Sequence, residues 1–240
     1  STATPSTVPT KPTPNSPPSG PLILVFGAHP DDIEFGCGGV VALSTQSGRP
    51  AHLVVCSRGE AATNGTPRQR TAEANQGAAC LGASLEFLAL GGDAHFEVRV
   101  AHVLKLAAII RRVRPGIVLA PSPVENQHPD HAVLGKMVLD AARLARYGGV
   151  KELRRQAAHT IGALHFYAVE LLLGGRSVED VRVGADFLSL PARVLFATED
   201  GSRGWQGRVT GLLERRLKDG APGIVYACGP TPMMRESARL

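Results

Sequence analysis

Histidine and aspartate side chains that directly follow an apolar run are the first feature of this sequence that could do chemistry. The run 22–27 is apolar and β-prone, and it leads into His29, Asp31 and Asp32 and then into the glycine-rich turn 36–39. A continuous apolar run of this kind predicts a strand of a parallel sheet that is buried on both faces. Because such sheets place their chemistry at the carboxyl ends of the strands, we expect these three side chains at that edge.

A second cluster of the same residue types lies about a hundred positions downstream. The apolar run 117–120 leads through a proline-containing turn into His128, Asp130 and His131. Two imidazoles and a carboxylate form a common ligand set for a catalytic divalent metal, usually zinc, with Fe²⁺ as an alternative. A further carboxylate beside the metal could act as a base. The competing interpretation is ordinary loop polarity, because Pro and Asp favour turns. Two such clusters, each after a predicted strand, favour the metal site.

These motifs resemble a known family. AHPDD with GCGG, together with HPDH, resembles the PIG-L/LmbE family of metal-dependent N-acetylglucosaminyl deacetylases over about residues 21–170. The segments SRGE (57–60), GTPRQR (65–70) and GGVKEL (148–153) resemble the branch that deacetylates N-acetylglucosaminyl-malate in bacillithiol synthesis. The resemblance implies a metal-dependent hydrolase, expected to use zinc, that removes an N-acetyl group from a small molecule containing N-acetylglucosamine.

The resemblance also implies roles for individual residues in the two clusters. Its metal ligands are His29, Asp32 and His131. Asp31 matches the general base of the family, and protonated His128 would stabilise the oxyanion. Asp130 would hold a nearby imidazole in orientation.

Four further residues near the two clusters bear on the site. Arg58 matches a residue of the family's substrate pocket, and Glu60 is expected beside it; a solvated salt bridge between the two is the alternative. Cys37 is either a ligand or a small apolar filler in the glycine-rich turn, and the filler role is favoured. Asn126 stands where the family commonly carries Asp, which alters the charge near the site.

Composition excludes several other classes of protein. The chain has 240 residues, 43% of them hydrophobic and 20% charged, which is ordinary for a soluble globular protein. The net charge of +5 is dispersed and aromatic residues are only 5%, so a nucleic-acid role is disfavoured, whereas an anionic small substrate suits the charge. The 4 cysteines contain no close pair, which predicts a reduced, cytoplasmic protein. No stretch reaches the roughly 18 apolar residues of a membrane span. A homo-oligomer is compatible with all of this.

The chain reads as alternating strands and helices after a short tail. Residues 1–20 are rich in Pro, Ser and Thr, and we expect them to be disordered. The alternation over 21–170 predicts an α/β fold, a three-layer α/β/α arrangement around a mainly parallel, Rossmann-like sheet. The expected strands are 22–27, 51–56, 84–90, 117–120 and 161–169, and the expected helices are 34–46, 67–80, 100–114 and 132–147.

The segment 171–240 resembles a different family. It is similar to the later part of the NAD-binding domain of ferredoxin-reductase-like proteins, most closely the electron-transfer subunit of dihydroorotate dehydrogenase. We expect it to extend the sheet of the first domain. NAD is not expected to bind, because the glycine-rich phosphate turn of such a domain does not precede residue 171 in the expected place.

Three alternatives to a deacetylase remain at this point. A metal-dependent phosphoesterase would use similar ligands, although such sites often hold two metals and more carboxylates. A catalytically impaired sugar-binding module would result if the altered last third removed the substrate wall. An NAD-linked reductase fragment is the interpretation of residues 171–240 taken alone.

Overall fold

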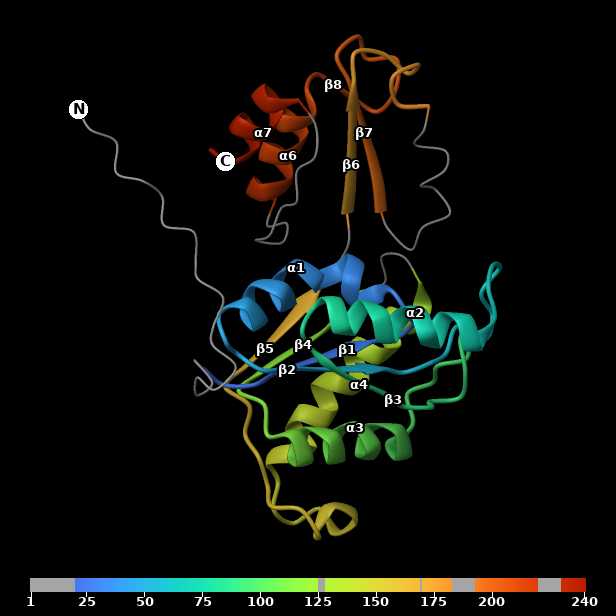
Figure 1. The fold of residues 1–240 in the computed structure, drawn as a ribbon, viewed down its shortest axis with the longest axis vertical. Helices are drawn as coiled ribbons and strands as arrows, with labels where there is room; N and C mark the ends of the chain where they lie inside the picture. Colours follow the sequence, from blue (N-terminus) through green and yellow to red (C-terminus); the bar gives the residue numbers. More distant parts are fainter. Residues whose placement is uncertain (1–19, 125–127, 169, 183–192, 220–229) are drawn as a thin grey trace, which may run out of the picture. The chain divides into compact units, whose positions relative to one another are not determined.

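The protein consists of two compact units, which are described separately. The computed structural model describes residues 20–124, 128–168, 170–182, 193–219 and 230–240 (Figure 1). Among these, residues 20–124 and 129–166 form the first unit, and His128 groups with the residues from Tyr167 onward in the second. The expected disorder of residues 1–20 falls almost wholly outside the described residues.

A five-stranded sheet with the order β3-β2-β1-β4-β5 forms the centre of the first unit. Its strands are β1 (Ile23–Gly27), β2 (Ala51–Val55), β3 (Ser84–Phe87), β4 (Ile117–Pro121) and β5 (Ala163–Tyr167). β1 pairs in parallel with both β2 and β4, and β2 pairs in parallel with β3. The strand order therefore reverses around β1, and the chain leaves β1 at a topological switch point, where open α/β sheets bind their ligands.

Helices cover both faces of this sheet, as the sequence predicts. α1 (Asp32–Gln46) and α2 (Pro67–Cys80) lie on one face, and α3 (Val100–Val113) and α4 (Pro129–Arg146) lie on the other (Figure 1). The fold is therefore an α/β fold with a mostly parallel sheet between helical layers. A short 3₁₀ helix, η1 (Lys151–Leu153), follows α4.

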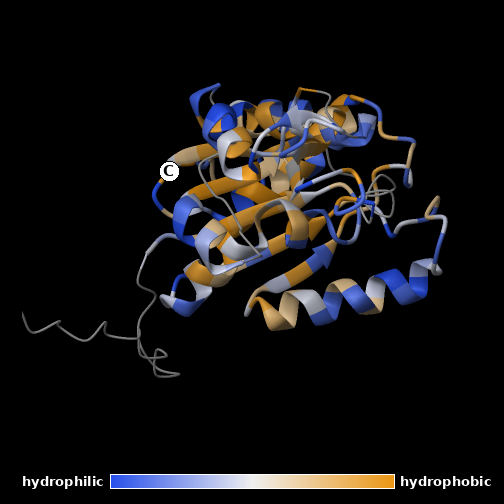
Figure 2. Cartoon of the chain, turned by 90° about the horizontal axis from the view of Figure 1, so that it is seen from above, coloured by the Kyte–Doolittle hydropathy of each residue, from blue (hydrophilic) through white to orange (hydrophobic). Residues whose placement is uncertain are grey.

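Alternation along the strands explains the two covered faces. Leu24 and Phe26 of β1 are fully buried in a core that also contains Leu106 of α3 and Met137 of α4. Because neighbouring side chains of a strand point to opposite faces, Val25 must face the helices on the other side. Hydrophobic colouring predominates in the central strands, whereas the helices alternate between hydrophobic and hydrophilic positions (Figure 2).

Local sequence signals set the ends of the helices. At the start of α2, Thr66 and Gln69 form a capping box and Pro67 takes the first helical position, which confirms the predicted span 67–80. α1 begins at Asp32 rather than at the expected position 34, and α4 begins at Pro129 rather than at 132. Pro129 can begin α4 because the N–H groups of the first turn have no intrahelical acceptor, so the missing N–H of proline costs no helix hydrogen bond. Asp32, Asp130 and His131 consequently lie in first turns.

The second unit has a sheet of its own. β6 (Glu170–Gly175), β7 (Arg193–Thr198) and β8 (Trp205–Gln206) pair in parallel, and α6 (Val209–Lys218) and α7 (Thr231–Ser237) belong to the same unit. In the described residues the expected continuation of the first sheet by 171–240 is not found, so that expectation is wrong. The reason lies in the backbone pairing: β6 pairs with β7 over its whole length, and β7 pairs with β8.

None of the helices within the described ranges is both long and apolar enough to span a bilayer.

Candidate metal centre

A sharp turn between β1 and α1 brings His29 and Asp32 together. Asp31, between them, has a φ of 104°, in the left-handed region that a non-glycine residue rarely adopts. Asp32 Oδ2 accepts hydrogen bonds from the backbone N–H groups of Ala28 at 2.8 Å and His29 at 2.9 Å. These bonds fold the Asp32 carboxylate back over the end of β1 and fix it beside the His29 ring.

His131 completes a group of three side chains from the two sequence clusters. Its Nε2 lies 3.1 Å from Asp32 Oδ1, and His29 Nδ1 lies 3.6 Å from Asp32 Oδ2. One ligand atom from each of the three residues lies within 4.8 Å of the others. The structure thus brings together the three side chains that the sequence predicts as metal ligands.

Burial and neighbouring groups shift the pKa values of Asp32 and His29 in opposite directions. Burial alone would raise the pKa of Asp32, but hydrogen bonds from His131 and His29 hold it well below its usual range. Burial lowers the pKa of His29, yet the hydrogen bond and charge of Asp32, the charge of Asp93 and the hydrogen bond to Asp130 outweigh it and raise the pKa to about 9. A buried carboxylate that stays ionised is a competent ligand for a cation.

The donor set fits a divalent ion of the zinc type. Two imidazoles and one carboxylate are the ligands of many catalytic zinc sites, which keep a fourth position open. Asp32 and His131 are buried, with relative exposures of 5% and 7%, which excludes bulk water from most of the site. His29, Asp32 and His131 are therefore the residues that would hold the ion.

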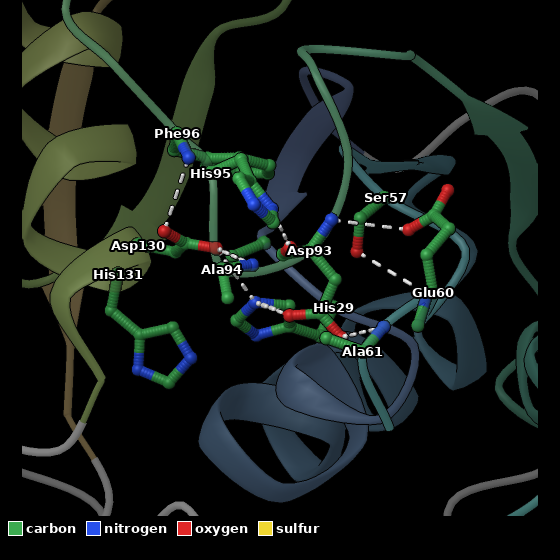
Figure 3. Close-up of polar contacts among 12 residues, drawn as sticks. His29, Ser57, Glu60, Ala61, Asp93, Ala94, His95, Phe96, Asp130 and His131 are labelled. Carbon is green, nitrogen blue, oxygen red and sulfur yellow. Dashed lines mark hydrogen bonds and ion pairs between the residues drawn. The ribbon is translucent and has the colours of Figure 1, made fainter. Parts of the chain in front are cut away.

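Asp130 contacts the opposite edge of the His29 ring. Its Oδ2 lies 3.2 Å from His29 Nε2 and accepts the Ala94 N–H at 2.7 Å, while its Oδ1 accepts the Phe96 N–H at 3.3 Å (Figure 3). The residue is buried, with 3% relative exposure. A buried carboxylate thus contacts the His29 imidazole and two backbone N–H groups at once.

Asp31 lies next to this group in sequence but has another partner. Arg70 Nη2 donates to Asp31 Oδ2 at 2.6 Å and to the Pro30 carbonyl at 2.9 Å. Burial raises the pKa of Asp31, and the hydrogen bond from Arg70 opposes that rise without cancelling it. A carboxylate with a raised pKa is a stronger base than an ordinary one. Arg70 is the last residue of the segment GTPRQR, and the sequence analysis gave it no role in the site.

The remaining residues that the sequence singles out are His128, Asn126 and Cys37. His128 is half-buried, immediately precedes α4 and groups with the second unit. Asn126 lies outside the described residues. Burial raises the pKa of the Cys37 thiol far above its ordinary value, which suits an apolar filler. Within the part of the chain that the structure describes, Cys37 belongs to no group of candidate metal ligands. A further histidine near the site, His95, forms a hydrogen bond from its Nδ1 to the backbone carbonyl of Asp93 at 2.6 Å, which is a structural role.

Arg58 and Glu60 follow β2 at the same edge of the sheet. The Arg58 side chain is exposed, lies over the Phe87 ring at 4.8 Å from its centroid and donates to Thr71 Oγ1 at 3.3 Å. Glu60 Oε2 accepts the backbone N–H groups of Arg58 at 3.0 Å and Asp93 at 3.2 Å. Glu60 is thus tied to the backbone of its own loop and of the loop that follows β3.

Asp93 is a site residue that the sequence reasoning missed. Its Oδ1 lies 3.0 Å from His29 Nε2, and Figure 3 shows Asp93 and Asp130 converging on the same ring. The sequence analysis gave Asp93 no role in the site. A usable signal was its place after the third strand, since that end of the strand reaches the same edge of the sheet as His29.

Comparison with known proteins agrees with this geometry. Residues 24–142, just under half of the chain, match the family model described as PIG-L, GlcNAc-PI de-N-acetylase. The chain is 31% identical over 159 residues to a 4-oxalmesaconate hydratase of Pseudomonas putida, a match that covers 61% of this chain and 60% of that protein. It is 28% identical over 160 residues to a diacetylchitobiose deacetylase of Thermococcus kodakarensis, covering 60% of this chain and 59% of the relative.

A solved structure and a further relative extend the comparison. A conserved protein of Thermus thermophilus has 32% identity and a TM-score of 0.56, over 60% of this chain and 64% of that one. A shorter match, 35% over 68 residues, links 28% of this chain to 26% of the electron-transfer subunit of dihydroorotate dehydrogenase B from Desulforamulus reducens. The chain thus spans about three fifths of the hydratase and the deacetylase that it matches. Its region 24–142 matches the PIG-L family and has deacetylases among its relatives.

Proposed function

We propose that this protein is a zinc-dependent N-deacetylase that hydrolyses the acetamide of a small molecule containing N-acetylglucosamine. The observation that carries the proposal is the convergence of His29, Asp32 and His131 inside a region that matches the PIG-L family. A relative named for deacetylation of diacetylchitobiose supports the chemistry. The motifs SRGE and GTPRQR support an N-acetylglucosaminyl-malate-like substrate, as in bacillithiol synthesis.

The protein residues divide the work around the reacting amide. When bound at His29, Asp32 and His131, a divalent ion would polarise the acetamide carbonyl and increase the acidity of the attacking water. Asp31 Oδ1 accepts a proton from the attacking water while the water oxygen forms a bond to the carbonyl carbon. Arg70 donates a hydrogen bond to Asp31 Oδ2. The same proton then passes to the nitrogen as the C–N bond breaks, which releases acetate and a free amine.

Two residues of the downstream cluster complete the assignment. We assign His128, in its protonated form, to the negative charge that develops on the carbonyl oxygen, by its match to the family motif. Asp130 orients an imidazole, and the structure supports this with its contact to His29 at 3.2 Å.

Substrate recognition is assigned to the loop after β2. The Arg58 guanidinium is exposed at the sheet edge where His29 lies, and its planar fork suits a carboxylate or a pair of sugar hydroxyls. Glu60 is the second residue of this pocket, and its bonds to the backbone of Arg58 and Asp93 support a role in shaping it.

The organisation of the whole chain is also a proposal. We assign residues 21–170 to the deacetylase domain and 171–240 to a grafted remnant of a ferredoxin-reductase-like NAD domain that binds no NAD, in a cytoplasmic protein able to form homo-oligomers. The 68-residue match to an electron-transfer subunit supports the second assignment. A fluorescence titration in which NADH bound at micromolar concentration would overturn the assignment of no NAD binding.

The experiment that tests the function measures amine and acetate release from N,N′-diacetylchitobiose and from N-acetylglucosaminyl-malate. We expect release by zinc-loaded protein and none after chelation. Asp31→Ala should retain zinc and lose at least about a hundredfold in kcat, since general-base catalysis contributes about 10²–10⁴-fold. Full activity of that variant would refute the role of Asp31.

A hydratase is the second candidate, because a relative at 31% identity carries that name. Water addition to an unsaturated carboxylic acid releases no amine, so the two reactions are separated by incubating the same protein with both substrate types. Loss of the conjugated absorbance of 4-oxalmesaconate, without amine release from the sugars, would replace the deacetylase proposal.

A further inference from the structure

An apolar groove lies between α3 and α4, the two helices that cover the face of the first sheet away from α1 and α2 (Figure 1). Its volume is about 320 Å³, and Val98, Val100 and Val103 line it on the α3 side. Val98 is 55% exposed and Val100 is 74% exposed. Neighbouring apolar side chains that remain open to solvent mark a surface that binds another molecule.

The α4 side of the groove is a single stripe of side chains at helical spacing. It consists of Asp140, Arg143, Leu144 and Tyr147, the last of which directly follows the helix. The Tyr147 ring is fixed by Arg146, whose guanidinium lies 5.0 Å from the ring centroid and donates to the hydroxyl at 3.1 Å. A held aromatic ring loses little entropy when it is buried, and Tyr is a frequent anchor of protein interfaces.

The two charges in the stripe are complementary to each other. Arg143 Nη1 lies 3.0 Å from Asp140 Oδ1, and both side chains are about half exposed. A partner of a single charge sign would attract one of them and repel the other. A second copy of this chain, related by a two-fold axis, would present its Arg143 to Asp140 and its Asp140 to Arg143, because contacts across such an axis are reciprocal. The charge pattern therefore favours a second copy over an acidic or a basic partner.

We propose that this groove is the contact surface of a symmetric homodimer, in which α4 of one copy runs antiparallel to α4 of the other. The valines and Tyr147 supply the apolar area that is buried, and the reciprocal pairs of Asp140 with Arg143 set the register of the two helices. The inference rests on the ability to form homo-oligomers given under the proposed function, but not on the metal or the substrate.

Sedimentation equilibrium of the full chain with exchanged charges tests this directly. We expect the unchanged protein to form a species of twice the 25.2 kDa mass of one chain. Asp140→Arg places like charges opposite each other, as does Arg143→Asp, so the dissociation constant of each variant should increase at least about tenfold. In a mixture of these two variants every contact again joins an Arg to an Asp, and the dimer should return.

A change on the α3 side of the groove tests its apolar part. Val100→Asp places a charge among the valines and should weaken the dimer at least about tenfold, because the charge would be buried without a partner. The variant should fold, since Val100 is the first residue of α3 and an acidic side chain is favourable at a helix N-terminus. Leu43→Asp is the matched control: Leu43 is 68% exposed on α1, on the other face of the sheet, and the dimer should be unaffected.

The outcomes distinguish this inference from the proposed function. A monomeric unchanged protein overturns the inference, as does a mixture of the two charge variants that stays monomeric. A dimer that survives Val100→Asp and both charge variants also overturns it, because another surface then joins the copies. A dimer that responds as expected, in a protein that releases no amine, supports the inference and counts against the deacetylase. Amine release by a protein that stays monomeric does the reverse.

Discussion

His29 lies among three carboxylates, which favour its protonated form in the metal-free protein. A metal that binds His29 must displace that proton. Burial lowers the pKa of His29, but the hydrogen bond and charge of Asp32, the charge of Asp93 and the hydrogen bond to Asp130 together raise it to about 9. A metal ligand must be neutral, so proton and metal compete for the same ring. The same acidic surroundings that stabilise a bound cation therefore hold a proton in the metal-free protein.

Zinc affinity should accordingly rise with pH. With a metal-free pKa of about 9, His29 is protonated at neutral pH, and its proton must leave when zinc binds. We expect the apparent affinity to increase about tenfold per pH unit between about pH 6.5 and 8.5 and to level off near 9, which follows from competition with one proton. Chelator-competition titrations across this range measure the slope. An affinity independent of pH would show that His29 is neutral before the metal arrives.

At the scale of elements, α4 approaches the turn that follows β4 very closely. A Cβ on Gly135 of α4 would lie 2.4 Å from the Pro121 carbonyl oxygen and 2.8 Å from the Pro123 nitrogen. Both are backbone atoms, which cannot move aside as a flexible side chain does. The glycine thus lets α4, whose first turn carries Asp130 and His131, pack directly on the strand end.

Gly135→Ala should therefore destabilise the protein although alanine is the better helix former. The helix preference gains up to about 1 kcal/mol, but overpacking costs about 1–3 kcal/mol, so we expect a net loss. Gly77→Ala in α2 is the matched control, because its Cβ would meet only the flexible end of the Glu34 side chain. Urea unfolding of the metal-free variants measures both changes. Equal stability of the two variants would contradict the close approach at Gly135.

A buried guanidinium donates hydrogen bonds at the C-terminal end of α4. Arg111 of α3 is 3% exposed and donates to five backbone carbonyls, of residues Leu144, Ala145, Tyr147, Leu153 and Gln156, at 2.6–3.3 Å. These carbonyls include the last ones of the helix, where the macrodipole favours a cation.

Replacing Arg111 with Met should cost about 2–4 kcal/mol in the free energy of unfolding, since several buried carbonyls lose their donors. Arg112→Met is the control at the next position: its side chain is 51% exposed and pairs with Glu86, so the expected loss is below about 1 kcal/mol. The two variants are compared by denaturant unfolding. Similar losses in both would show that the Arg111 bonds contribute little.

For the whole molecule, the first unit follows from local sequence signals and the second does not. Apolar runs and the capping box at Thr66 predict the strands and helices of 21–170, and the paired motifs predict His29, Asp32 and His131 as neighbours. The position of Asp93 beside His29 was not predicted, because it depends on a turn with three positive φ angles. It also depends on backbone hydrogen bonds from this turn to Glu60 and Asp130. No spacing rule encodes such contacts.

The separate sheet of the second unit was not predicted, for a related reason. β6 and β7 read as further strands of a parallel α/β fold, and a strand pattern specifies which face is buried but not which neighbour it pairs with. The observed pairing of β6 with β7 along their full length is a tertiary choice. Adding these strands to the first sheet was the simpler expectation, and it was wrong.

The central claim is that His29, Asp32 and His131 share one divalent ion, and a zinc titration of the metal-free protein tests it most directly. The account predicts one ion bound per chain, with binding weakened at least about a hundredfold in His29→Ala, Asp32→Ala and His131→Ala, because two remaining protein ligands hold the ion far less tightly than three. His165→Ala, an exposed histidine of β5, should bind as the unchanged protein does. Undiminished zinc binding in the three ligand variants would contradict the account.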